Sequence, residues 1–184
     1  MKFIWRLYSM IFISCFCIRM NSSAQLIVNN GATPQQLVQN LLGAGVSVSN
    51  ITYTGASVAR GLFIGNNSNI GLSGGVLLTS GSVFNALGPN NSGSSGTISS
   101  LPGYPILDSI SGVTTFDAAI LEFDFVPMAD TIRFRYVFAS EEYDEFVCGS
   151  VNDAFGFFIS GPVLQDKKIL PLFQEHPFRF PLIR

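Results

Sequence analysis

The chain has 184 residues, of which 47% are hydrophobic and only 12% are charged. That length is enough for one domain with a substantial core, and no block of charge indicates disorder. With 10 basic against 12 acidic residues, the sequence lacks the clustered Lys and Arg that phosphate binding needs, so we expect no nucleic acid partner.

The N-terminal segment is typical of a secretory signal. Lys2 and Arg6 precede an apolar run from residue 7 to 18, and Ser22-Ser23-Ala24 supplies small residues for cleavage. The run is too short to span a bilayer comfortably, although an uncleaved anchor is the alternative. We therefore expect residues 1–24 to be removed, leaving an exported chain that does not span the membrane. Removal leaves seven bases and twelve acids, a net charge of 7 − 12 = −5.

Cysteine use excludes a disulfide framework. Signal cleavage removes Cys15 and Cys17, and Cys148 is then alone. A buried, inert thiol is a better interpretation than a nucleophile, because the only histidine, His176, lies in a segment of irregular pattern near the end of the chain.

From residue 25 onward, the pattern predicts an all-β domain with one short helix. An edge strand is expected at residues 25–28. The helix follows Thr33, which can cap it, with Pro34 in the first position and Gly43 at the end. Its expected shared face is Leu37, Leu41 and Leu42. From Val46 the apolar residues alternate in VSVSNITYTG, ASVARGLFIG and GVLLTSG, which predicts an antiparallel, jelly-roll-like β-sandwich.

Residues 82–115 form a long segment rich in Gly, Ser and Pro. Loops of that length in a compact domain are usually functional or mobile. The segment contains no phosphate-binding glycine pattern and no nucleophile elbow of the hydrolases.

The sequence AAILEFDFVPMADTIRFRYVFAS predicts a β-hairpin about residues 127–130. In that register Asp124 faces Arg133 and Glu122 faces Arg135, while the aromatic residues share the other face. A further strand is predicted in DAFGFFISGP, with Phe155, Phe157 and Ile159 on one side.

Between these aromatic strands lies FASEEYDEFVCGSVND, residues 138–153, here named the acidic segment. It carries five of the twelve carboxylates, and no Lys or Arg lies between Tyr136 and Pro162. Those carboxylates are Glu141, Glu142, Asp144, Glu145 and Asp153. Like charges so close disfavour ionisation unless a cation neutralises them.

Three interpretations of the acidic segment are open. The first is a solvated connection, the usual fate of surface acids. The second is a site for a hard cation, Ca²⁺ above all, with Glu141, Glu142, Asp144, Asn152 and Asp153 as ligands, although the spacing is not that of an EF-hand. The third is a glycosidase-like carboxylate pair, which is less favoured because the only Trp, Trp5, lies in the signal and leaves no Trp platform for a sugar.

The run FDAAILEFDFVPMADTIRFRYVFASEEYDEFVCGSVNDAFGFFISGP resembles the choice-of-anchor L domain family, as do LVQNLLGAGVSVSNITYTG and GLFIGNNSNIGLSGGVLLTSGSV upstream. The resemblance covers residues 33–162. It implies an exported β module of large envelope-associated proteins, found mainly in the Bacteroidetes group, with no established reaction.

The resemblance therefore implies a non-catalytic adhesive, ligand-binding or structural module, secreted or at the cell surface, whose extracellular ligand is a glycan or a protein. The alternative function is that of a secreted carbohydrate-active hydrolase that uses the carboxylates of Glu141–Glu145.

After Pro162 the resemblance ends, and residues 163–184 show no strand alternation. We expect an incomplete domain over residues 25–162, followed by an aberrant, disordered tail over residues 163–184 without an anchoring signal. A frameshift near Val163 would explain the tail. Codons permitted for LFQEHPFRFPLI, residues 172–183, can be read in a shifted frame as IPGTSISVSIN, which is typical of the family's continuation.

Sequencing the gene beyond the Val163 codon tests this expectation. An out-of-frame continuation that encodes more of the domain is the expected result. A gene in which no other reading frame beyond the Val163 codon encodes more of the domain would contradict it.

Overall fold

The structure is a computed structural model. It describes residues 25–42, 45–88, 96–129, 131–139 and 153–162, together with the backbone of residues 164–170 and 178–179. The expected signal at residues 1–24 therefore lies outside the described residues. Within them, every strand pairing is antiparallel and only two short α-helices occur, so the predicted all-β class is confirmed.

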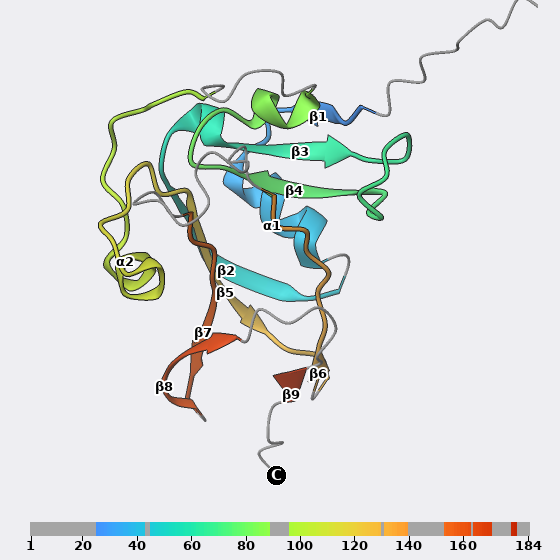
Figure 1. The fold of residues 1–184 in the computed structure, drawn as a ribbon. Coiled ribbons are helices and arrows are strands. Elements are labelled where there is room, and N and C mark those ends of the chain that lie inside the picture. Colours follow the sequence, from blue (N-terminus) through green and yellow to red (C-terminus); the bar gives the residue numbers. More distant parts are fainter. Residues whose placement is uncertain are drawn as a thin grey trace, which may run out of the picture.

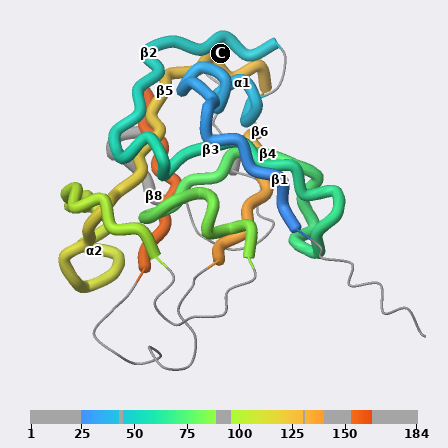
Figure 2. Tube along the Cα trace, turned by 90° about the horizontal axis from the view of Figure 1, so that it is seen from above, coloured from blue at the N-terminus to red at the C-terminus, as the bar shows by residue number. Residues whose placement is uncertain are grey.

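Two groups of strands enclose the first helix. One is a sheet in the order β1 (Ile27–Asn29), β3 (Arg60–Ile64) and β4 (Gly74–Leu78). The other is the pair of β2 (Ser47–Thr54) and β5 (Ile120–Val126). Helix α1 (Pro34–Leu42) contacts both β2 and β4, and two views agree in placing it between the sheet and the pair (Figures 1 and 2). The predicted strand at residues 25–28 appears as β1, at the edge of its sheet.

Helix α1 begins with the cap that the sequence predicts. The Gln36 backbone N–H donates to Thr33 Oγ1 at 3.3 Å, and the Thr33 N–H donates to Gln36 Oε1 at 2.8 Å, which is a reciprocal capping box. Leu37 and Val38 are 0% exposed, whereas Leu41 is 47% exposed. The predicted face is therefore wrong at Leu41, because the two flanking layers of strands contact the helix along the side of Leu37 and Val38.

The predicted hairpin is wrong in its pairing. Strand β5 pairs with β2, so that Asp124 lies opposite Ser49 and Glu122 opposite Thr52. Alternate residues of β5 do turn inward, as the sequence predicts. The partner differs because β2 offers a strand of matching length, with Val48 opposite Phe125.

Two of the four charges that the sequence pairs across the hairpin, Asp124 and Arg135, have other partners. Asn50, in a bulge of β2 with φ of 51°, donates from Nδ2 to Asp124 Oδ2 at 2.6 Å. Arg135 donates from Nη2 to the Gly71 carbonyl oxygen at 2.7 Å. In the part of the chain that the structure describes, these contacts replace the expected ion pairs with Arg133 and Arg135.

Three short helical segments complete the middle of the chain. These are η1 (Ser57–Ala59), η2 (Val83–Leu87) and α2 (Pro105–Ser111). Two of them fall inside the segment that the sequence predicts as a loop. Helix α2 has Pro105 at its start and ends at Gly112, which adopts the left-handed conformation with φ of 76°.

The remaining strands are β6 (Thr131–Ile132), β7 (Phe157–Gly161), β8 (Leu164–Leu170) and β9 (Phe178–Arg179). Strand β6 pairs with β9, and β7 pairs with β8. The backbone pairings of β8 and β9 thus lie in the segment 163–184, for which the sequence shows no strand pattern. Where the domain ends stays a prediction.

Replacing Leu37 with Ala tests the buried face of α1. We expect the free energy of unfolding to fall by about 2–5 kcal/mol, because the change leaves a cavity between two layers of strands. Leu41→Ala is the matched control on the same helix and should cost about 1 kcal/mol or less. Equilibrium unfolding in urea measures both, and equal losses would contradict the placement of α1.

Candidate functional site

The acidic segment is described only at its two ends. Asp153 is exposed and precedes β7, whereas Glu141, Glu142, Asp144 and Asn152 lie outside the described residues. So do Glu145 and Cys148. Among the residues that are described, no group of three or more His, Cys, Asp or Glu side chains is placed to hold a metal ion. The calcium site therefore stays a prediction.

Ring contacts bring the two flanks of the acidic segment together. We name the aromatic cluster from its five members: Phe134, Tyr136, Phe138, Phe155 and Phe157. The ring centroids of Phe134 and Phe157 are 4.1 Å apart, and those of Phe138 and Phe155 are 6.1 Å apart and stacked. Tyr136 contacts both Phe155 and Phe157, at 5.7 and 5.9 Å.

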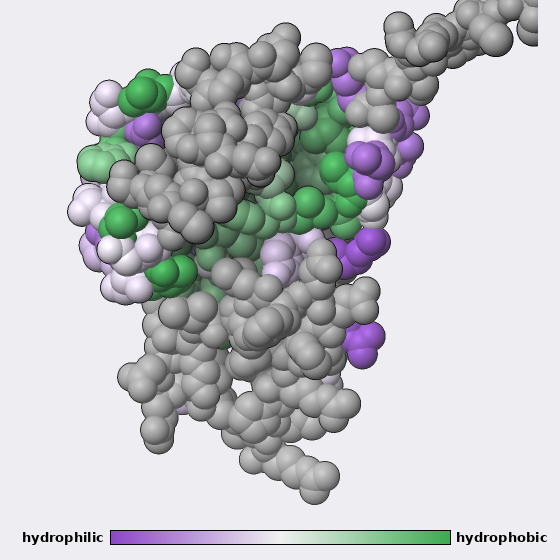
Figure 3. All heavy atoms as spheres, in the orientation of Figure 1, coloured by the Kyte–Doolittle hydropathy of each residue, from purple (hydrophilic) through white to green (hydrophobic). Residues whose placement is uncertain are grey.

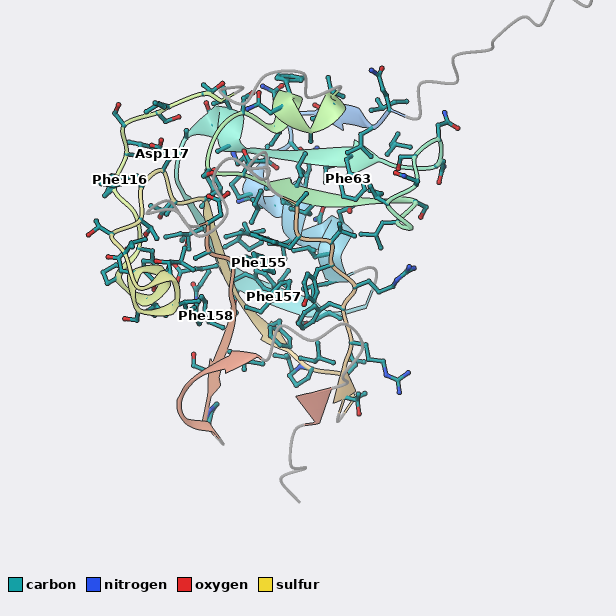
Figure 4. The ribbon with its side chains drawn as sticks, in the orientation of Figure 1. Phe63, Phe116, Asp117, Phe155, Phe157 and Phe158 are labelled. Atoms are coloured by element: carbon teal, nitrogen blue, oxygen red, sulfur yellow. The ribbon has the colours of Figure 1, made fainter. Side chains whose placement is uncertain are left out.

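The alternation predicted around Phe155 is confirmed. Phe155 and Phe157 contact the preceding flank, whereas Phe158 turns to the other side, toward α2 (Figure 4). A Cβ atom on Gly156 would collide with the Phe158 ring and lie 3.5 Å from Ile110 Cδ1. The flank is thus held from both sides, by the aromatic cluster and by α2.

The order of the ring contacts gives the relative direction of the two flanks. Phe134 meets Phe157 and Phe138 meets Phe155, so the two flanks run antiparallel. The cluster members that lie nearest the undescribed part of the acidic segment in the sequence, Phe138 and Phe155, are therefore neighbours in space.

Two aspartates organise a second region, at residues 96–118. Asp117 accepts from the backbone N–H groups of Ser99 and Leu101, at 3.1 and 2.7 Å. Asp108 accepts from both the N–H and the Oγ1 of Thr115, each at 2.6 Å. These bonds lower the pKa of Asp108, the side-chain bond first and the backbone bond second. The segment predicted as a loop is thus shaped locally by side-chain acceptors.

This second region carries a shallow groove of about 470 Å³. Its lining is Ile98, Ser100, Leu101, Pro102, Phe116 and Asp117. Phe116 is 70% exposed and Ile98 is 84% exposed, while the Asp117 carboxylate is occupied by its two backbone donors. Figure 4 shows Phe116 and Asp117 together, away from Phe155 and Phe157. The groove thus offers apolar contact area without a free acid.

A third feature is a half-buried cation that the sequence analysis misses. The Arg60 guanidinium lies over the Tyr53 ring, with Cζ 4.7 Å from the ring centroid. Tyr53 donates from its hydroxyl to the Ala56 carbonyl oxygen at 2.8 Å. Burial raises the pKa of Tyr53, and the positive charge of Arg60 partly offsets that rise. The signal in the sequence is that Arg60 is the only charged residue between Arg19 and Asp108.

Apolar side chains also gather on the surface near these features. Figure 3 shows them in the middle of one face, over β3, β4 and α1, with polar side chains along one edge. No helix in the described ranges has the length and apolar content needed to cross a bilayer.

Thr115→Val tests the account of Asp108. Loss of the Oγ1 donor should raise the pKa of Asp108 toward its ordinary value of 3.8, as measured by NMR titration of the carboxyl carbon. Because the pKa of Asp108 is lowered in the folded state, this carboxylate stabilises the folded state at pH values above its ordinary pKa. The contribution is lost as the pH falls through the pKa of the folded state. The variant should therefore lose less stability than the wild type below about pH 4.

Ser109→Ala is the matched control, since that hydroxyl donates to the Pro105 carbonyl oxygen on the same helix. It should leave the pKa of Asp108 unchanged. Equal titration curves for the wild type and Thr115→Val would contradict the assignment.

Comparison with known proteins gives one match. The family model described as the Choice-of-anchor L domain matches residues 26–171. The match extends past Pro162, where the resemblance in the sequence ends, and includes β7 and β8. No curated protein and no solved structure matches the chain. Because the match covers most of the 184 residues, the chain belongs to the Choice-of-anchor L domain family.

Proposed function

We propose that this chain is a non-catalytic binding module of an exported, surface-associated protein. The observation that carries the proposal is membership of the Choice-of-anchor L domain family over residues 26–171. An N-terminal segment typical of a secretory signal supports export. The ligand we propose is an extracellular glycan or protein.

The acidic segment is the binding element that we propose, with Ca²⁺ as its stabilising ion. Its ligands are Glu141, Glu142, Asp144, Asn152 and Asp153. Carboxylate and amide oxygens are the donors that Ca²⁺ prefers, and exported proteins meet this ion at useful concentrations. Two observations support the proposal: the segment contains no base, and the aromatic cluster closes its two flanks on each other.

Electrostatics gives the reason for a cation. Five carboxylates within thirteen residues, from Glu141 to Asp153, repel one another if all are ionised. Aromatic contacts that bring the flanks together increase this repulsion energy, because the carboxylates can then move less far apart. A divalent ion removes that repulsion and adds coordination bonds.

Thermal unfolding with and without Ca²⁺ tests the ion. At a concentration about 100 times the dissociation constant, Ca²⁺ should raise Tm by roughly 5–10 °C over the value with a chelator. Asp144→Asn should abolish this shift, because it removes one charged ligand. Glu122→Gln, an exposed carboxylate on β5, is the matched control and should keep the full shift. A Tm that Ca²⁺ leaves unchanged would rule out the site.

A hydrolysis screen against soluble polysaccharides tests the competing function in the same preparations. We expect no turnover. Turnover that Glu142→Gln abolishes would overturn the non-catalytic assignment and support a carbohydrate-active hydrolase.

A further inference from the structure

Arg60 is a cation without a local counterion. All twelve Asp and Glu residues lie at or beyond Asp108 in the sequence, and Arg60 is the only charge between Arg19 and that point. Any carboxylate that pairs with Arg60 must therefore come from the second half of the chain or from another molecule.

The guanidinium is also partly desolvated. Its Nε and Nη1 atoms are buried and have no hydrogen-bond partner in the structure described. Tyr53 covers the planar group through a cation–π contact, but a ring face accepts no strong hydrogen bond. Buried N–H groups that lack acceptors destabilise the folded state, so Nε and Nη1 require acceptors.

Among the described carboxylates near the sheets, Glu122 is exposed on β5 and three others already accept hydrogen bonds. Asp108 accepts from Thr115, Asp117 accepts from Ser99 and Leu101, and Asp124 accepts from Asn50. These three acids accept hydrogen bonds from other donors, and none of them accepts one from Arg60.

We propose that Arg60, with Tyr53 stacked on it, is a binding site for a carboxylate group. Because the Tyr53 ring lies against one face of the guanidinium, the N–H groups are left to donate in the plane of the group. A carboxylate is planar and has two acceptor oxygens, so it can accept from the Nε and Nη2 N–H groups, which share one edge of the guanidinium, while Nη1 lies at another edge.

The carboxylate has two possible sources with the same chemistry. One is an acidic side chain of this chain, for which the acidic segment supplies the densest choice. The other is the carboxylate of a separate molecule, such as an acidic sugar. The site is independent of the calcium proposal, because Arg60 and Tyr53 belong to β3 and β2 rather than to the acidic segment.

The Nε–H signal of Arg60 in the NMR spectrum of the wild-type chain tests the proposal directly. A charge-assisted hydrogen bond should move this proton signal downfield of the Arg133 signal, since Arg133 is exposed. An Arg60 signal at the position of the Arg133 signal, both without and with added sodium acetate, would overturn the proposal.

Two further samples separate the sources. Replacing Glu141 and Glu142 with Gln, and Asp144 with Asn, should return the signal upfield if the acidic segment is the source. A downfield signal that survives these changes without acetate identifies another carboxylate of this chain. A signal that moves downfield only when acetate is added identifies a separate molecule.

Thermal unfolding of Arg60→Met provides a second measurement. The Tm should fall by roughly 5–15 °C if an acid of the chain is the partner, because a buried carboxylate then loses its cation. If the partner is a separate molecule, the wild type should have a higher Tm in sodium acetate than in sodium chloride of equal ionic strength. The Tm of Arg60→Met should be the same in the two salts. Arg133→Met is the control and should change Tm by no more than about 2 °C. An Arg60→Met chain that melts at or above the wild type in both salts would contradict a carboxylate partner.

Discussion

Contacts between aromatic rings on the two flanks of the acidic segment determine the geometry on which its proposed function depends. Phe134 packs on Phe157 and Phe138 stacks on Phe155, so the described residues on either side of the acidic stretch are neighbours in space. Aromatic pairs contribute about 0.5–1.5 kcal/mol each beyond their buried area. Apolar packing of the flanks therefore does not depend on how the charges between them are neutralised.

Charge is distributed very unevenly along the chain. Between Arg19 and Asp108 the sheet strands and α1 carry one charged residue, Arg60, and the acids all follow. Low charge lets the strands bury Leu37 and Val38 of α1 without desolvating ionised groups. The single charged residue in this region, Arg60, is therefore an exception that needs an explanation. A cation retained against Tyr53 in such a region requires a partner that the neighbouring sequence does not supply.

Much of the fold could be predicted from local sequence signals. Thr33 and Gln36 form the cap, and the period of two locates β2 to β5 and the inward face of β7. Strand pairing could not be predicted in the same way. The inward residues of β5 pack equally well in a hairpin or against β2, and alternation does not distinguish a partner five residues away from one seventy residues away. Helix α2 had its signals in Pro105 and Gly112, but seven residues are too few for a helical period to show.

The two candidate sites differ in the same way, because one can be found from the sequence and the other only from the structure. Composition alone identifies the acidic segment, because it depends only on where charges and bases fall in the sequence. Arg60 becomes a candidate only when the structure shows its nitrogens buried against Tyr53, since one base in an alternating run is ordinarily a solvent-facing residue.

The two proposed cations do not replace each other. If a carboxylate of the acidic segment pairs with Arg60, the five negative charges of the segment fall only to a net 1 − 5 = −4. Pairing with Arg60 would place that carboxylate beside Tyr53, because the guanidinium lies over the Tyr53 ring. The remaining charges would still repel one another, and a divalent ion would reduce that repulsion directly. The two proposed cations would thus have different roles, Arg60 in positioning one carboxylate and the divalent ion in neutralising the others.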